Sequence, residues 1–182
     1  MEGVERYKVR LLAHNEEWER EFARVRALIE QVWGEAVLAI EHVGSTAVPS
    51  IPAKPILDAA VMVRSLGALD TDALSGKGYD FCGYQGDSKE RMLFVLRGEG
   101  QVSLQHIHVY QRDSAEFYRQ TGFRDYLIAN PEAAEEYAAI KRGLAERFRD
   151  DRAAYTKGKE EFIRRILRRM EGAWKADEGG DL

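Results

Sequence analysis

Three groups of residues in this sequence carry side chains that could bind an anion or a metal ion. The first is Gly44-Ser45-Thr46, which follows an apolar segment. A glycine lets the backbone approach a ligand closely, and the hydroxyls of Ser45 and Thr46 with nearby N–H groups could hold phosphate oxygens in an anion-binding nest. The same tripeptide also fits an ordinary turn at the end of a strand, and it lacks the spacing of a Walker-type phosphate loop.

The second candidate is Asp58, the one carboxylate within the apolar run 56–63 (ILDAAVMV). Burying a carboxylate costs free energy unless it is paired, hydrogen-bonded or bound to a cation, and strand propensity gives no reason for aspartate here. A metal ion or a ligand cation is therefore a natural partner. The structural alternative is an ion pair with Lys54 or with Arg91.

The third candidate is the pair His106 and His108. Residues two apart on a strand project from the same face, so both imidazoles would point one way while Ile107 faces a core. Neutral imidazoles can bind a divalent metal, and protonated ones can contact phosphate. His42 lies at the end of another predicted strand, so we expect it near Asp58 as a further metal ligand. The alternative is that these histidines are packing residues that bind no ligand.

Hydrophobic spacing predicts the elements that position these residues. Apolar residues three and four apart predict an amphipathic helix over 14–33, ended by Gly34. Three prolines within seven residues predict a rigid loop between the strands on either side of it. The predicted strands are 36–43, 56–63, 79–84, 91–97 and 102–110, with a short helix over 66–76 and a hairpin turn at 98–100.

The remainder of the chain is predicted to be helical, over 113–128, 131–148 and 151–173. Asn130 is expected to cap the second of these helices, with Pro131 as its first residue. The order of elements predicts an α+β fold: a small mixed or antiparallel sheet with an N-terminal helix and a C-terminal helical segment. We expect one compact unit, with a core over 1–112, a helical segment over 113–175 packed on it, and a frayed tail over 176–182.

Composition narrows the class of protein. The 182 residues include 32% charged and 45% hydrophobic residues, which is typical of a globular domain. A single cysteine excludes an internal disulfide, no apolar run approaches the roughly 20 residues that span a bilayer, and the N-terminus lacks the apolar region of a signal peptide. We therefore expect a soluble, cytoplasmic protein without membrane partners.

Charge is unevenly distributed along the chain. The net charge is −4, which argues against a general nucleic-acid binder, yet residues 141–169 contain eleven Lys or Arg against five Asp or Glu. A helical segment with this excess could attract phosphates, or it could present a solvated face. A small-molecule ligand is the expected partner, and the sequence does not indicate an oligomeric state.

Two of these motifs resemble the signature of the GrpB family. They are 42–49 (HVGSTAVP) and 53–58 (AKPILD), and the likeness extends from about residue 7 to 165. Further residues that carry it are 106–109 (HIHV), 123–127 (FRDYL), Pro131, Tyr137, Lys141, Tyr155, Lys159 and 162–163 (FI). Ser50 stands where the family usually has glycine.

The resemblance implies a fold of the polymerase-beta-like nucleotidyltransferase superfamily. In that superfamily a Gly-Ser turn holds nucleotide phosphates and acidic residues on two strands bind two magnesium ions. Gly44 and Ser45 match the turn, and Asp58 matches the first acid. Ala60 occupies the second acid's position, and the later strand has His106 and His108 in place of a carboxylate. GrpB-type domains also occur fused to dephospho-coenzyme A kinases, which hints at nucleotide-related work.

Three functions remain open at this stage. In the first, Asp58, His106 and His108 hold a divalent ion (Mg, Mn or Zn) for nucleotidyl transfer to a small acceptor. Phosphates would bind the Gly44–Thr46 turn, with Lys54 and Arg91 neutralising their charge. Arg124 and Lys141 are further expected ligand-binding residues, and the helices that carry them and Lys159 would form the far wall of the cleft. In the second, the protein is a catalytically degenerate nucleotide-binding sensor or accessory module. In the third, the histidines and Asp58 form a metal site for hydrolytic chemistry.

Overall fold

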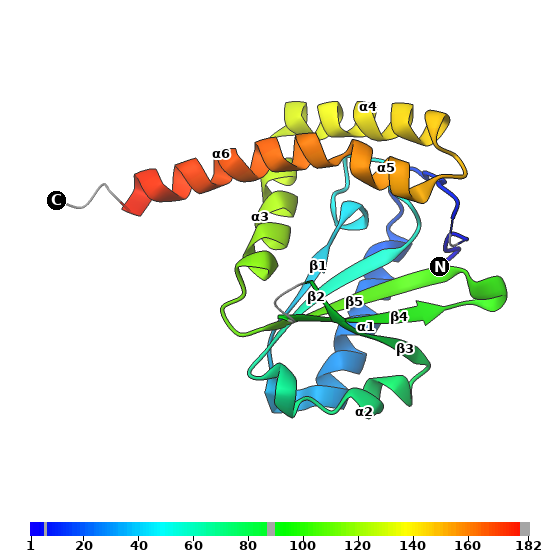
Figure 1. Cartoon of the computed structure of the whole chain (residues 1–182), viewed down its shortest axis with the longest axis vertical. Coiled ribbons are helices and arrows are strands. Elements are labelled where there is room, and N and C mark those ends of the chain that lie inside the picture. Colours follow the sequence, from blue (N-terminus) through cyan, green and yellow to red (C-terminus); the bar gives the residue numbers. More distant parts are fainter. Residues whose placement is uncertain (6, 87–89, 179–182) are drawn as a thin grey trace.

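The computed structural model describes residues 1–5, 7–86 and 90–178, and its centre is a five-stranded sheet (Figure 1). The strand order is β1-β2-β5-β4-β3. Among the described strands, β2 and β5 pair in parallel, whereas the other neighbours are antiparallel. The strands are β1 (Val37–Val43), β2 (Leu57–Val63), β3 (Tyr79–Gln85), β4 (Arg91–Arg97) and β5 (Ser103–Gln111). The predicted α+β class with a mixed sheet is confirmed.

One face of the sheet is covered by α1 (Glu17–Trp33) and the short α2 (Thr71–Ser75). The apolar stripe of α1 is buried as its spacing predicts, and Ile29 packs in one cluster with Phe94 and Ile107. Gly34 ends the helix with a positive φ of 46°, which favours glycine. Residues 14–16 lie outside the helix, which starts later than predicted; the Asn15 side chain accepts the N–H of Glu17 there.

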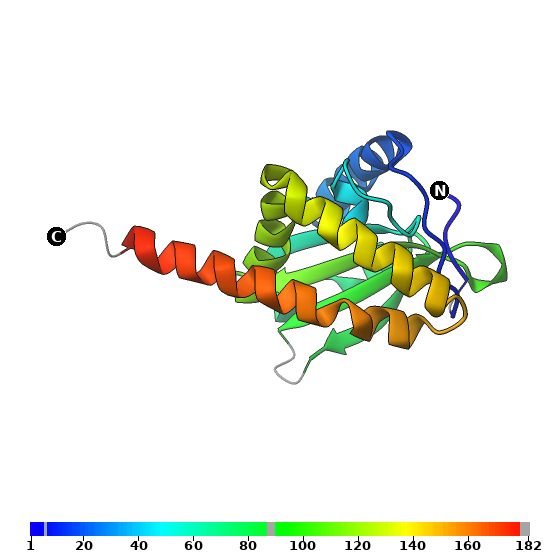
Figure 2. The same cartoon turned by 90° about the horizontal axis from the view of Figure 1, so that it is seen from above.

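The other face is covered by helices from the C-terminal half. These are α3 (Ala115–Ala129), α4 (Pro131–Arg147), α5 (Arg152–Gly158) and α6 (Glu160–Glu178). Figures 1 and 2 show α4 and α6 lying across one end of the sheet, with the last turns of α6 extending past the body. Tyr137 of α4 stacks on Phe162 of α6, and both pack against Val48 and Ile51 of the proline-rich loop. The helical segment is therefore fixed to the loop that follows β1.

The structure corrects three details of the predicted helical segment. The helix expected over 151–173 is two helices, α5 and α6, which are separated at Lys159. Gly158, the last residue of α5, packs so closely against the side chain of Leu144 that a Cβ would not fit there. Asn130 is the N-cap residue of α4 and Pro131 its first residue, as predicted, but the Asn130 side chain forms no capping bond; its amide donates to the Tyr126 carbonyl instead. Helix α6 continues past its predicted end at residue 173 to Glu178, into the predicted tail, and 179–182 lie outside the described residues.

In the part of the chain that the structure describes, every helix is too short or too polar to cross a bilayer.

The alternation of buried and partly exposed side chains along β5 leads to the first prediction. Ile107 is fully buried against α1, between two histidines that face the other way, so Ile107→Ala should lower the free energy of unfolding by about 2 to 5 kcal/mol. Ile128→Ala, at a half-exposed position of α3, should change it by less than about 0.5 kcal/mol. Urea unfolding measures both, and equal costs would contradict the assigned facing of β5.

Candidate functional site

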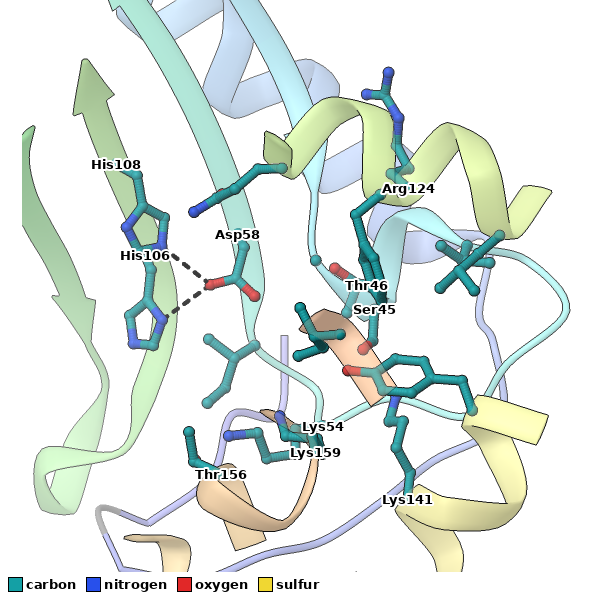
Figure 3. Close-up of a pocket in the computed structure, with 18 of the residues that line it drawn as sticks. Ser45, Thr46, Lys54, Asp58, His106, His108, Arg124, Lys141, Thr156 and Lys159 are labelled. Atoms are coloured by element: carbon teal, nitrogen blue, oxygen red, sulfur yellow. Dashed lines mark hydrogen bonds and ion pairs between the residues drawn. The ribbon is translucent and has the colours of Figure 1, made fainter. Parts of the chain in front are cut away.

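A cavity of about 470 Å³ lies between the sheet and the helical segment (Figure 3). Its floor is formed by β2, β5 and the turn after β1, and its walls come from α3, α4, α5 and α6. The polar residues that line it include Ser45, Lys54, Asp58, His106, His108, Tyr137, Lys141, Arg152, Tyr155 and Lys159. Most of the side chains singled out by type and spacing therefore share one cavity.

Asp58, His106 and His108 form a cluster at the sheet side of this cavity, as Figure 3 shows. The parallel pairing of β2 with β5 places Asp58 opposite His106 and Ala60 opposite His108, so these four side chains share one face. His106 Nδ1 lies 3.0 Å and His108 Nε2 3.6 Å from the same oxygen, Oδ1 of Asp58. One potential ligand atom from each residue lies within 4.8 Å of the other two.

Asp58 is partnered by the two histidines. Burial opposes ionisation of this carboxyl, but the hydrogen bonds from His106 and His108 outweigh that effect and hold the pKa of Asp58 below its usual range. Neither Lys54 nor Arg91 forms an ion pair with Asp58 among the described residues, so that alternative is wrong. The result is an ionised carboxylate that two imidazoles hold in place.

Gly44 is required here for two reasons. Its φ of 72° and ψ of −170° lie in a region that residues with a side chain avoid. In addition, a Cβ at this position would lie 2.6 Å from Oδ2 of Asp58. The glycine therefore lets the turn pass directly over the carboxylate, and Asp58 is confined between this turn and β5.

The two hydroxyl residues of the turn differ in their surroundings. Thr46 is buried, and its Oγ1 lies 3.0 Å from Nε2 of His42. Ser45 is half-buried in the cavity, and its side chain forms a hydrogen bond with the hydroxyl of Tyr137 on α4. Ser45 therefore links the turn to the helical segment, whereas the hydroxyl of Thr46 already serves an internal contact.

Two predicted site residues, His42 and Arg91, lie away from the Asp58–His106–His108 cluster. His42 pairs with Ala59 on the face opposite Asp58, where its ring stacks on Phe22 of α1; its assignment as a fourth metal ligand is wrong. Arg91 lies opposite Tyr110, at the far end of β5 from His106, and does not line the cavity. The prediction failed for both because sequence spacing gives neither the face of a strand nor the distance along it.

Arg124 lines the cavity, but its guanidinium is occupied by protein partners. It donates to Glu41 at 2.7 Å, to the His42 carbonyl at 2.8 Å and to the neighbouring Asp125 at 2.7 Å. These bonds attach α3 to β1. Its position therefore fits a role in fixing the wall of the cavity better than a role in binding a ligand.

Three lysines supply positive charge to the cavity from different parts of the fold. Lys54 comes from the proline-rich loop, Lys141 from α4 and Lys159 from the break between α5 and α6. Burial, reinforced by the neighbouring cations Arg152 and Lys159, lowers the pKa of Lys54 to about 8. Burial likewise lowers the pKa of Lys141 and of Lys159. Among the described residues, none of the three forms a salt bridge with a carboxylate.

Two tyrosines accompany these lysines. The Lys141 ammonium lies 5.4 Å from the centre of the Tyr137 ring, and Lys159 lies 4.7 Å from that of Tyr155, which Lys54 also approaches at 5.6 Å. The hydroxyl of Tyr155 is buried, and no described residue forms a hydrogen bond with it. Reasoning from the residues alone missed both tyrosines as site residues. The repeated Tyr-x-x-x-Lys spacing could have indicated them, because residues four apart share one helix face.

The contact between Gly44 and Asp58 leads to a second prediction. Gly44→Ala should lower the free energy of unfolding by more than Gly100→Ala, because Gly100 also has a positive φ but open space around it. Backbone strain alone costs about 1 to 3 kcal/mol for a residue with a side chain in the region that Gly44 occupies. In an Asp58→Ala background the cost of Gly44→Ala should fall, and chemical unfolding of the four variants measures that coupling. An unchanged cost would mean that the two residues do not contact.

Comparison with known sequences places this chain among bacterial relatives. The Glutamate-rich protein GrpB of Alkalihalophilus pseudofirmus is 35% identical over 176 residues, which cover 93% of this chain and 100% of that protein. UPF0157 protein YqkA of Bacillus subtilis is also 35% identical, over 86% of this chain and 46% of YqkA, so the chain spans about half of that relative. A dephospho-CoA kinase of Mycolicibacterium paratuberculosis is 29% identical over 97% of this chain and 49% of the kinase.

Comparison with solved structures and with family sequence models identifies the same family. A crystal structure of GrpB from Enterococcus faecalis matches with a TM-score of 0.82 and 31% identity, over 91% of this chain and 99% of that chain. Cid1, described as an RNA terminal uridylyl transferase, matches with a TM-score of 0.52 and 13% identity over 75% of this chain and 42% of Cid1, which is a likeness of fold. The sequence model of the GrpB protein matches residues 8–169, and the chain therefore belongs to the GrpB family.

Proposed function

We propose that this protein binds a nucleotide, or another small molecule with a phosphate chain, together with a divalent metal in the cavity described above. One observation carries the proposal. Three lysines without carboxylate partners among the described residues face the same cavity as Asp58, His106 and His108. A metal-binding cluster beside concentrated positive charge is the arrangement that a metal-bound phosphate chain requires.

The state of the lysines supports a ligand with several negative charges. Their ammonium groups disfavour one another, and burial adds to that cost. A phosphate chain would supply the missing counter-charge and could also accept a hydrogen bond from the hydroxyl of Tyr155. An isolated neutral ligand would leave this cost in place.

The size and the remaining lining of the cavity fit a nucleotide. A volume of about 470 Å³ lies within the roughly 300 to 1,000 Å³ typical of small-ligand sites. Its apolar wall could hold a base or another apolar group and includes Val48, Phe123, Leu127, Ile163 and Leu167. The match to a dephospho-CoA kinase also favours nucleotide-related work, by association.

Nucleotidyl transfer is the reaction that this arrangement could support. An acceptor hydroxyl attacks the α-phosphorus of a nucleoside triphosphate, the bond from that phosphorus to the bridging oxygen breaks, pyrophosphate leaves and the hydroxyl proton passes to solvent. A bound divalent ion neutralises phosphate charge in such reactions. Lys54, Lys141 and Lys159 would stabilise the charge that develops on the departing pyrophosphate, and Asp58, His106 and His108 would hold the ion. The fold shared with Cid1 favours this chemistry over hydrolysis by a His/Asp metal site.

A second candidate function is a non-catalytic nucleotide sensor. Ala60 favours it, because this fully buried residue lies on the same face as Asp58, where a second carboxylate would help to hold paired metal ions. Ligand binding without any release of pyrophosphate, in the presence of metal and varied acceptors, would support the sensor.

A thermal-unfolding screen tests the proposal directly. Nucleotides, coenzymes and inorganic pyrophosphate are added, each with and without magnesium, manganese or zinc. A ligand at a hundredfold excess over its Kd should stabilise the fold by about 2.7 kcal/mol. Absence of stabilisation by every phosphate compound, with or without metal, would rule out the proposed function.

Removal of one lysine gives the third prediction. Lys159→Met should weaken binding of pyrophosphate or of a stabilising nucleotide by at least about tenfold, since a charge-assisted contact is worth roughly 1.5 to 3 kcal/mol. Lys157→Met removes the same charge from an exposed position of α5, just before the break that carries Lys159, and should change affinity by less than about threefold. Titration calorimetry measures both, and equal losses would mean that only net charge matters.

Proton uptake by Lys54 gives the fourth prediction. Burial, with smaller effects of Arg152 and Lys159, lowers its pKa to about 8 in the free protein, where Asp58 acts in the opposite direction. A bound phosphate chain should raise this pKa. The complex then holds more protons than the free protein, so affinity should fall as the pH rises from 7 to 9. Calorimetry in buffers of different ionisation enthalpy should detect uptake of up to about half a proton per ligand at pH 8 from this group.

The matched control for that measurement is Lys54→Arg. A guanidinium stays charged throughout this pH range, so the variant should lose the part of the pH dependence that Lys54 contributes. Lys141 and Lys159 are present in both proteins, but a charge at position 54 lowers the pKa of Lys141, so the difference reports Lys54 together with this coupling. An identical pH dependence in the two proteins would contradict titration of Lys54 on binding.

A further inference from the structure

We infer that the Asp58–His106–His108 cluster holds one divalent ion of the zinc, manganese or iron type, in place of a pair of magnesium ions. This inference rests on the proposed function, because it identifies the metal that would accompany the phosphate ligand. Three independent features of the site support it: the chemistry of the donor atoms, their spacing, and the residues where a second ion would need ligands.

The donor set consists of two imidazole nitrogens and one carboxylate oxygen. Magnesium takes oxygen ligands in near-octahedral geometry, so this cluster would offer it one suitable protein ligand. Imidazole suits zinc, iron and other transition ions, which bind more tightly than magnesium to mixed nitrogen and oxygen sites. The change from carboxylate to histidine on β5 therefore changes which metal the site prefers.

The spacing fits a single ion. Ligand atoms at about 2.1 Å from one tetrahedral ion lie roughly 3.4 Å from each other. The distances from Asp58 Oδ1 to His106 Nδ1 and to His108 Nε2 are 3.0 Å and 3.6 Å, on either side of that value. Three protein ligands leave at least one coordination position open, as in catalytic metal sites, and a phosphate oxygen could take it.

A second ion would find few protein ligands beside the first. Ala60, opposite His108 on the same face, offers only a methyl group. The other oxygen of Asp58, Oδ2, points toward the backbone at Gly44, where even a Cβ would lie 2.6 Å away. His42, the remaining nearby imidazole, lies on the opposite face of the sheet. Among the described residues, Glu116 of α3 also lines the cavity, but it pairs with Arg119 and lies outside the Asp58–His106–His108 cluster. The cluster itself therefore lacks the paired carboxylates that hold two metals together.

Direct metal titration of the chelator-treated full chain, without nucleotide, tests the inference. We expect one Zn²⁺ or Mn²⁺ per chain and at least 100-fold weaker binding of Mg²⁺. Pulsed electron paramagnetic resonance of the Mn²⁺ protein should detect coupling to directly bound imidazole ¹⁴N. Two ions per chain, Mg²⁺ binding within tenfold of Mn²⁺, or a Mn²⁺ signal without nitrogen coupling would each overturn it.

Variants assign the binding to these side chains. His106→Gln should weaken Mn²⁺ binding by at least tenfold and reduce the nitrogen coupling, whereas His14→Gln, at a histidine that does not line the cavity, should leave both unchanged. The spectrum of the unaltered protein decides the matter if His106→Gln does not fold. If the protein binds metal but no phosphate compound, only the proposed function is overturned. If it binds phosphate compounds but shows no preference for metals that take nitrogen ligands, only this inference is overturned.

Discussion

The parallel pairing of β2 with β5 is the constraint on which the site depends. This register sets Asp58 beside His106 and Ala60 beside His108, on the face opposite the main apolar core. A buried carboxylate is tolerated there because two imidazoles stabilise its charge and the turn at Gly44 covers its other oxygen. A shift of the strand by one residue would move Asp58 into the core under α1.

The helical segment completes the cavity by adding positive charge to this cluster. Packing of Tyr137, Phe162 and Ile166 against the proline-rich loop fixes the helices over the sheet. That packing offsets the cost of holding lysines in a partly buried cavity, where burial and mutual repulsion lower their pKa values. The break after Gly158 also contributes to the cavity, because it places Lys159 beside Tyr155 and close to the loop that carries Lys54.

The site also departs from the arrangement that its fold suggests. The family resemblance implies paired acids and magnesium, but the cluster at the sheet side of the cavity combines one carboxylate with two imidazoles, and Ala60 stands at the second acid's position. Only some of the basic residues of the helical segment line the cavity, among them Lys141 and Lys159. Others lie on the outer surface of the helices, where Arg165 pairs with Glu136. The local excess of Lys and Arg thus serves both the cavity and the exposed faces.

The sequence by itself determined the strands, most helix boundaries and the facing of His106 and His108, because these follow from local periodicity and from the alternation of side chains along a strand. It also identified Asp58, since a lone carboxylate in an apolar run needs a partner. Only the tertiary structure decided which partner that is, that His42 faces the other way, and that Arg124 is occupied by Glu41. The physical reason is that strand order and helix packing join residues far apart in the chain, and no local pattern encodes those distances.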